Sequence, residues 1–305
     1  MNCKKLLTTS MILTSCILYA PHAFAAQPIK AQVSKSYTDI SRLIEYNNYE
    51  DADARLKEIL SKNPNDLDAK ALQLISQAKQ WKLAPTQAEL DRLIKQYPNN
   101  PTFHYAQGLV YLMRETSSDV EYIKNISNLS NAAIQEFVKA VELDSSYYQA
   151  YNAMGVATLK LGNRKDAQDL FKTAIKINPQ FAPAYDNLGN IAMLEGDLDQ
   201  AEKYYLQSIK YNSHNPTSMY HMGQVESRRG DYTKALTWLN HSLHINPNSS
   251  PGWNLQGELY LKQGNQPAAI NSFKKAIYVK PENSRPYINL AGVYERRSDH
   301  EFAME

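Results

Sequence analysis

Few side chains of this sequence have the types and spacing that chemistry requires. Both cysteines, Cys3 and Cys16, lie within the first 26 residues. His241 and His244 are three residues apart, which places both on one face of a helix, but no carboxylate follows at helical spacing to complete a metal site. No phosphate-binding loop, His-Glu-x-x-His helix or nucleophile elbow with histidine and acid partners is present. We therefore expect no catalytic residue, no metal site and no cofactor, in a protein that is not an enzyme.

The first 26 residues have the features of a signal peptide. Lys4 and Lys5 give a positive start, and residues 6–20 are mostly apolar. Ala23-Phe24-Ala25 then ends in small residues at the spacing of a cleavage site. The apolar stretch is shorter than the roughly 20 residues of a membrane-spanning helix. We therefore expect cleavage after Ala25 or Ala26, and export to the periplasm or the medium.

A second interpretation of this segment concerns Cys16. Leu13-Thr14-Ser15-Cys16 resembles the lipobox of bacterial lipoproteins, in which the cysteine is lipidated and anchors the protein in the outer membrane. Residues 17–20 are still apolar, however, whereas a lipoprotein turns polar after its cysteine. Ordinary cleavage is the preferred hypothesis, and it leaves a mature chain without thiols.

The charge balance argues against two classes of partner. The chain has 33 basic and 31 acidic residues, and loss of Lys4 and Lys5 leaves 31 of each. A neutral chain lacks the basic excess that nucleic acids or anionic membranes attract. No later segment is apolar enough to span a bilayer. We expect a protein or peptide partner, no nucleic acid and no integral membrane span.

Proline and glycine recur along the chain at intervals of 34 residues or twice that distance. Such a period predicts a stack of two-helix units. In the best-formed units, from residue 148, apolar residues fall at helical spacing twice per unit. The recurring residues are Pro64 and Pro98; Pro179, Pro247 and Pro281; Gly155, Gly189, Gly223 and Gly257; and Gly162, Gly196, Gly230 and Gly264.

These residues also predict how each unit is built. A glycine followed by Asn or Asp, as in Gly196-Asp197, predicts the end of one helix and the cap of the next. The prolines end the second helices. The mid-helix glycines predict a close approach of the two helices. We expect the glycines to be met from the second helix by small residues, namely Ala167, Ala201, Ala235 and Ala269.

At these residues the chain resembles the tetratricopeptide repeat (TPR) family over about residues 33–305, most strongly between 148 and 283. The resemblance implies an all-α fold, a right-handed superhelical solenoid of about seven and a half helix-turn-helix units with a concave groove lined by the first helices. After a linker over 27–32, the units lie near 33–66, 67–100, 101–147, 148–181, 182–215, 216–249, 250–283 and, partially, 284–305.

Two departures from the repeat leave alternatives open. The third unit carries thirteen extra residues, 115–127, which could be an elaborated surface turn, part of a longer helix, or a lip over the groove. The eighth unit stops at Glu305 without the polar capping helix that usually closes a solenoid. A second copy of the chain could cover this end as a homodimer, or the chain could continue in a longer protein.

The TPR resemblance also implies which residues face the groove. Several of them are asparagines, whose amides both donate and accept hydrogen bonds and could hold the backbone of an extended peptide. The alternative is that these asparagines simply face solvent and bind no ligand. The implied groove residues are Asn152, Asp186, Asn187, Asn190, Tyr220, His221, Gln224, Asn254, Glu258 and Asn289, with Arg228 and Lys262 further along.

We therefore expect a non-catalytic interaction scaffold of the cell envelope that binds an extended peptide or a partner helix in its concave groove. Two alternatives remain at this stage. The chain could be the recognition arm of a larger enzyme such as a glycosyltransferase. It could also be a lipid-anchored outer-membrane, pilus or secretion assembly factor.

Overall fold

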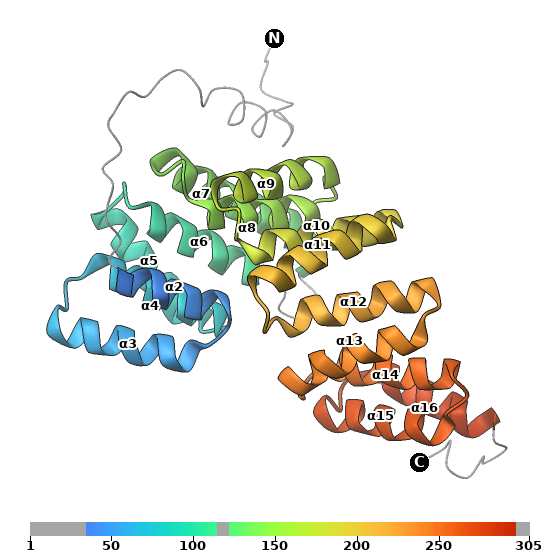
Figure 1. Cartoon of the computed structure of the whole chain (residues 1–305). Helices are drawn as coiled ribbons and strands as arrows, with labels where there is room; N and C mark the ends of the chain where they lie inside the picture. Colours follow the sequence, from blue (N-terminus) through green and yellow to red (C-terminus); the bar gives the residue numbers. More distant parts are fainter. Residues whose placement is uncertain (1–34, 115–121, 297–305) are drawn as a thin grey trace. The chain divides into compact units, whose positions relative to one another are not determined.

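The computed structural model describes residues 35–114 and 122–296, and every regular element in them is an α-helix (Figure 1). The predicted all-α class is therefore confirmed. The predicted signal peptide, the linker and Cys16 lie outside the described residues. No described helix combines the length and the apolar character needed to cross a membrane.

The chain divides into two compact units, one ending at Pro179 and the other beginning at Gln180. We call them unit 1 and unit 2. The helices of unit 1 are α2 (Lys35–Glu45), α3 (Tyr49–Lys62), α4 (Leu67–Lys79), α5 (Leu83–Gln96), α6 (Pro101–Arg114), α7 (Tyr122–Leu143), α8 (Tyr148–Lys160) and α9 (Arg164–Ile177). The helices of unit 2 are α10 (Ala182–Glu195), α11 (Leu198–Tyr211), α12 (Pro216–Arg229), α13 (Tyr232–Ile245), α14 (Ser250–Lys262), α15 (Gln266–Val279) and α16 (Ser284–Arg296).

Within each unit, successive helices pair as antiparallel hairpins that stack on one another (Figure 1). In unit 2, α10 packs on α11, α12 on α13 and α14 on α15, and each second helix also packs on the first helix of the next hairpin. This is the stack of helix pairs that the 34-residue period predicts. The predicted helix ends are confirmed as well, because α9, α13 and α15 each stop two residues before a proline.

The turn within each hairpin forms as predicted where glycine is present. Gly196 has φ 81° and Gly230 has φ 84°, in the left-handed region where a side chain would be strained. The following Asp197 and Asp231 then accept hydrogen bonds from the backbone N–H groups of their helices. Asn163 is an exception, because its side chain makes no cap bond. In the looser first hairpins Asn47 (φ 61°) and Trp81 (φ 63°) adopt the left-handed conformation without glycine.

A close contact between glycine and an aromatic ring holds most hairpins together. A Cβ atom added at Gly257 would lie 2.6 and 2.8 Å from Cδ1 and Cζ of Phe273. Gly108, Gly155 and Gly189 face Phe137, Phe171 and Tyr205 in the same way. All four rings are completely buried. The ring of the second helix therefore packs directly against the backbone of the first helix at the glycine.

This contact corrects the prediction that alanines meet the glycines. The alanines are buried, but in three of the four hairpins the ring one helical turn later reaches the glycine first. Only at Gly223 is an alanine the first residue that an added Cβ atom would meet, with the backbone oxygen of Ala235 at 3.3 Å from that Cβ. In that hairpin Leu239 replaces the aromatic residue, and its Cβ lies 3.5 Å away.

The third hairpin and the last described helix contain the two departures from the repeat, the insertion at 115–127 and the incomplete eighth unit. Part of the predicted insertion belongs to α7, which begins at Tyr122 and has 22 residues. At the other end, α16 leaves Tyr287 and Ile288 46% and 69% exposed. Residues 297–305, which complete the predicted eighth unit, lie outside the described residues.

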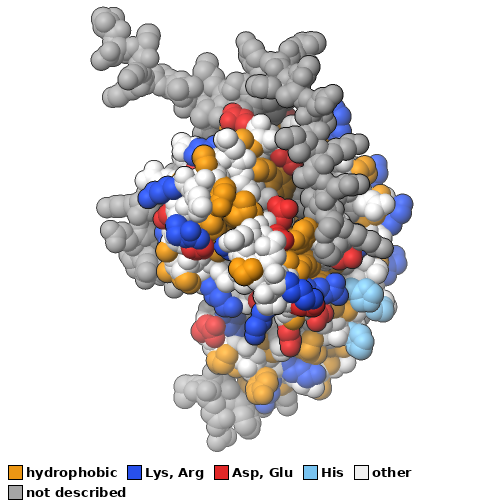
Figure 2. Space-filling model, turned by 90° about the vertical axis from the view of Figure 1, so that its left-hand side faces the viewer, with side chains coloured by type: hydrophobic (Ala, Val, Ile, Leu, Met, Phe, Trp, Pro, Cys, Tyr) orange, Lys and Arg blue, Asp and Glu red, His pale blue; other side chains and the backbone are white. Residues whose placement is uncertain are grey.

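The face of the protein drawn in Figure 2 is mixed in charge. On the face drawn in Figure 2, blue basic and red acidic side chains are interspersed with orange hydrophobic ones, and no field of one sign covers that face. This agrees with the nearly equal numbers of basic and acidic residues in the sequence.

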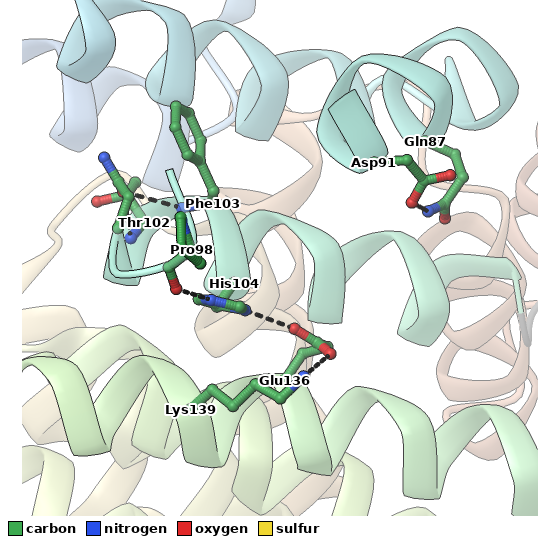
Figure 3. Close-up of polar contacts among 9 residues, drawn as sticks. Gln87, Asp91, Pro98, Thr102, Phe103, His104, Glu136 and Lys139 are labelled. Atoms are coloured by element: carbon green, nitrogen blue, oxygen red, sulfur yellow. Dashed lines mark hydrogen bonds and ion pairs between the residues drawn. The ribbon is translucent and has the colours of Figure 1, made fainter. Parts of the chain in front are cut away.

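One buried ion pair joins the two helices of the third hairpin. His104 of α6 is only 5% exposed, and its Nδ1 lies 2.7 Å from Oε2 of Glu136 on α7 (Figure 3). Its Nε2 lies 2.8 Å from the carbonyl oxygen of Pro98. Because an ionised carboxylate and a carbonyl only accept, the protonated imidazole can donate to both. The hydrogen bond to Glu136 raises the pKa of His104, against the opposing effects of burial and of the nearby Lys139.

The glycine–aromatic contact predicts unequal responses to the same small substitution. Gly257→Ala should lower the free energy of unfolding by about 1–3 kcal/mol, because the new methyl group collides with the Phe273 ring. Gly223→Ala should stay within about 1 kcal/mol of the wild type, because alanine favours the helix and no ring stands in the way. Urea unfolding followed by circular dichroism measures both. Phe273→Leu should reduce the cost of Gly257→Ala, and equal costs at the two glycines would contradict the proposed packing.

The His104 pair predicts a pH-dependent contribution to stability. Since the folded-state pKa lies above the unfolded value of 6.5, the contribution is complete below about pH 6.5 and is lost as pH rises through the raised pKa. The free energy of unfolding, measured by urea titration between about pH 6 and pH 9, should therefore fall more in the wild type than in His104→Gln. Parallel curves for the two proteins would show that the pair does not titrate in this way.

Candidate functional site

A polar groove of about 470 Å³ lies in unit 2, on α12, α14 and α16, the first helices of three successive repeats. Side chains of α12 and α14 and the start of α16 form its walls. The lining residues are Tyr220, Gln224, Ser227, Arg228, Pro251, Asn254, Leu255, Glu258, Asn283 and Arg285.

The repeat explains why these side chains meet. Tyr220 and Asn254 hold the same position in successive repeats, 34 residues apart, as do Gln224 and Glu258. Because α12 and α14 are corresponding helices of neighbouring hairpins, equivalent positions face the same side of unit 2. These four lining residues belong to the ten that the sequence predicts.

The groove contains a hydrogen-bonded network centred on Glu258. Asn254 Nδ2 donates to Glu258 Oε1 at 2.8 Å. Asn289 Nδ2 donates to the same Oε1 at 3.0 Å and to Asn254 Oδ1 at 2.9 Å. Asn254 is 6% exposed, so these bonds satisfy an amide that water barely reaches. The two asparagines therefore position Glu258, and both Nδ2 hydrogens of Asn289 are used within the network.

A second pair of side chains forms the α12 wall. Gln224 Nε2 donates to the hydroxyl oxygen of Tyr220 at 3.1 Å, which leaves the tyrosine proton available. Burial raises the pKa of Tyr220, the charge of Glu258 adds to this effect, and Arg285 opposes it. The phenol therefore stays protonated and can donate at neutral pH.

Two arginines line the same groove. Arg228 donates one hydrogen bond, from Nη1 to the carbonyl oxygen of Met193 at 2.9 Å. Arg285 lies near enough to Tyr220 to influence its pKa. Within residues 35–114 and 122–296, neither guanidinium forms an ion pair with a carboxylate.

Asp186, also predicted to face the groove, instead joins α10 to α12. Its carboxylate accepts hydrogen bonds from Ser218 Oγ at 2.6 Å and from Asn215 Nδ2 at 2.7 Å. Burial raises the pKa of Asp186, while the hydrogen bonds and the neighbouring His221 oppose that rise. The Asp186 side chain therefore joins two neighbouring hairpins, the one that begins with α10 and the one that begins with α12.

This cluster brings a serine, a histidine and an aspartate together, a combination that invites comparison with a catalytic triad. Ser218 is completely buried, and its hydroxyl donates to Asp186. The His221 ring stacks on Tyr205, with centroids 5.1 Å apart, and its Nδ1 lies 3.0 Å from Gln224 Oε1. A nucleophile needs an exposed oxygen bonded to its base, so the cluster does not have the geometry of a triad.

The remaining predicted residues lie outside the set that lines the groove. Asn190 accepts a hydrogen bond from the Tyr205 hydroxyl at 2.8 Å, and Asn187 lies half-buried on α10. Asn152 belongs to α8 of unit 1. Asn289 borders the groove through its bonds to Asn254 and Glu258.

The sequence prediction missed several lining residues, of which Arg285 is the most important. Arg285 and Pro251 occupy the same place in successive repeats, at the start of a first helix. The groove side of a helix was inferred from its middle, so the first turn was left out. The 34-residue period could have identified both residues.

In unit 1, the first helices are joined by a polar contact that spans most of the unit. Gln149 Nε2 of α8 donates to Glu45 Oε1 of α2 at 3.1 Å, although 104 residues separate them. Burial raises the pKa of Glu45, and Gln149 and the charge of Lys79 oppose that rise. The rings of Tyr105 and Tyr147 pack 5.0 Å apart in the same unit. These side chains bind one another within unit 1.

Nothing in the described residues indicates a metal site. His241 and His244 are exposed on α13, and no group of three His, Cys, Asp or Glu side chains is placed to hold an ion among residues 35–114 and 122–296.

Comparison with protein families gives matches described as tetratricopeptide repeat. They cover residues 148–181, 180–248 and 250–283, which include all of the groove except Arg285. No curated protein matches the sequence.

Solved structures with a similar fold include three with informative coverage. A chain of the APC/C hetero-tetramer Cut9–Hcn1 matches with a TM-score of 0.72 and 20% identity, over 85% of this chain and 49% of that one, so this chain spans about half its length. Pseudomonas aeruginosa pilF matches with a TM-score of 0.57 and 16% identity, over 72% of this chain and 94% of that one. A tetratricopeptide repeat protein from Parabacteroides merdae matches with a TM-score of 0.54 and 16% identity, over 85% of this chain and 99% of that one. At these identities the likeness shows the fold.

Proposed function

Because the chain is a tetratricopeptide-repeat protein, we propose that it is a non-catalytic interaction scaffold whose unit 2 groove binds an extended peptide segment of a protein partner. TPR repeats generally serve protein–protein interaction, which supports the scaffold role. The choice of an extended peptide over a partner helix is ours. It rests on the polar groove that runs across α12, α14 and α16.

The hydrogen-bonding groups of the groove suit a peptide backbone. The Tyr220 hydroxyl and the two guanidinium groups can donate to carbonyl oxygens, and the second carboxylate oxygen of Glu258 can accept from a backbone N–H. Leu255 and Pro251 add apolar surface between these polar groups. An extended segment presents carbonyls, N–H groups and side chains in alternation, so it can satisfy all of them.

The compartment is a second part of the proposal. The positive, apolar and small-residue pattern over residues 1–26 supports export to the periplasm or the medium. Such a protein would act as a scaffold in the cell envelope. A homodimer through α16 also stays a prediction, and the exposure of Tyr287 and Ile288 supports it.

Peptide binding in the groove can be tested by filling the groove. Ser227→Trp places a large ring in the groove, whereas Thr237→Trp adds the same ring to the exposed side of α13. Twelve-residue peptides selected from a random display library against the full chain should lose at least about tenfold in affinity for Ser227→Trp. The same peptides should keep their affinity for Thr237→Trp. Failure to select any peptide, or equal affinities for both variants, would contradict the proposal.

Export can be tested on the intact gene product. After expression in a Gram-negative host and osmotic release of the periplasm, the intact mass should match a chain that begins at Ala26 or Gln27. Full-length protein confined to the cytoplasm would contradict export. A lipid-modified Cys16 in the membrane fraction would instead support the lipoprotein alternative.

A further inference from the structure

We propose that the unit 2 groove selects an acidic side chain within an extended peptide, and that Arg228 and Arg285 bind its carboxylate. This inference rests on the proposed peptide binding and specifies its chemistry. It is carried by three observations: the supply of hydrogen-bond donors, the charge of the groove and the placement of both arginines in one hollow.

The available donors of the groove outnumber its available acceptors. Arg228 uses one of its five N–H donors on Met193, and Arg285 uses none of its side-chain donors within the described residues. Tyr220 keeps its hydroxyl proton, because it accepts from Gln224. The groove therefore suits a group that is rich in acceptors.

The acceptors of the groove are largely occupied. Glu258 Oε1 receives two amide N–H groups, and Asn254 Oδ1 receives a third. Asn283 Oδ1 accepts from the backbone N–H of Arg285. The second carboxylate oxygen of Glu258 is the main acceptor left among the lining side chains.

The charges of the groove point the same way. Two arginines and one glutamate line it, so its formal charge is positive by one. An incoming carboxylate can form charge-assisted hydrogen bonds with a guanidinium fork, which are stronger than bonds between neutral groups. A lysine side chain would face two guanidinium groups and find one carboxylate that already accepts two hydrogen bonds.

The arginine pair is specific to this place in the stack. The positions one repeat earlier are Leu194 and Pro251, which carry no charge. Lys262 is the counterpart of Arg228 one repeat later; it is exposed, as Arg228 and Arg285 are, but it does not line the groove. Lys262 is therefore matched to Arg228 in helix position and charge, and it serves for both arginines as a control for the loss of one positive charge on a first helix.

The experiment uses the peptides selected from the random display library, resynthesised with an acetylated N-terminus and an amidated C-terminus. Their only carboxylates are then side chains. The selected sequences should share an Asp or Glu, and its replacement by Asn or Gln should weaken binding to the full chain by about tenfold in fluorescence polarisation.

Variants of the protein assign that loss to the arginines. Arg285→Met should lower the affinity for the peptide with Asp or Glu about tenfold. It should leave the affinity for the peptide with Asn or Gln at that position unchanged, because only the acidic side chain binds the guanidinium. Lys262→Met should change neither. Arg285→Glu should reverse the preference, so that a new selection enriches Lys or Arg at the same peptide position. Arg228→Met should act in the same direction, with its thermal unfolding checked because Arg228 also bonds Met193.

Several results would overturn the inference. Selected peptides without an acidic preference, or an acidic peptide that binds Arg285→Met and Lys262→Met equally well, would refute it while peptide binding itself stands. Binding that requires a free C-terminal carboxylate would also refute it. Failure to select any peptide would refute both this inference and the proposed function.

Discussion

Most of the described hairpins depend on one close approach of two helices. In four of the hairpins, an aromatic ring of the second helix lies on a glycine of the first, where even a methyl group would collide with the ring. The contact brings the axes of the two helices together. Leu239 with Gly223 shows that an aliphatic side chain can occupy the same place with more room to spare. The stacking of hairpins, and hence the groove, follows from this spacing.

The groove of unit 2 is a direct product of the repeat. Because corresponding positions on α12 and α14 face the same way, Tyr220 and Gln224 lie beside Asn254 and Glu258 without any dedicated loop. Equivalent positions in successive repeats nevertheless have different residues with different hydrogen-bond partners. Asn254 and Asn289 bond Glu258, whereas Asp186 at the corresponding place on α10 bonds Ser218 and Asn215. One geometric position thus serves packing between hairpins in one repeat and the groove in another.

These differences also mark how far the sequence predicts the structure. Proline and glycine give the helix ends almost to the residue, because each restricts the backbone locally. The period also identifies the groove side of the first helices, and four of the ten predicted residues line the hollow. It does not reveal whether a polar side chain bonds its neighbour or remains available to a ligand. Asn254, Asp186 and Asn190 were therefore assigned to a ligand, although protein groups occupy much of their hydrogen-bonding capacity. The tyrosine and phenylalanine rings that contact the glycines were missed because small residues alone were expected there.

The bond between Glu45 and Gln149 gives unit 1 a property that simple stacks lack. A linear array of hairpins, each touching only adjacent hairpins, can fray from either end at little cost to the rest. In unit 1 the first helix of the first hairpin is tied to the first helix of the fourth. Fraying of α2 must therefore release a partner on α8, so the opening of the two is coupled. Amide hydrogen exchange in α2 should accordingly be slower than its terminal position in the stack would suggest, because its local opening disturbs a helix 104 residues away in the chain.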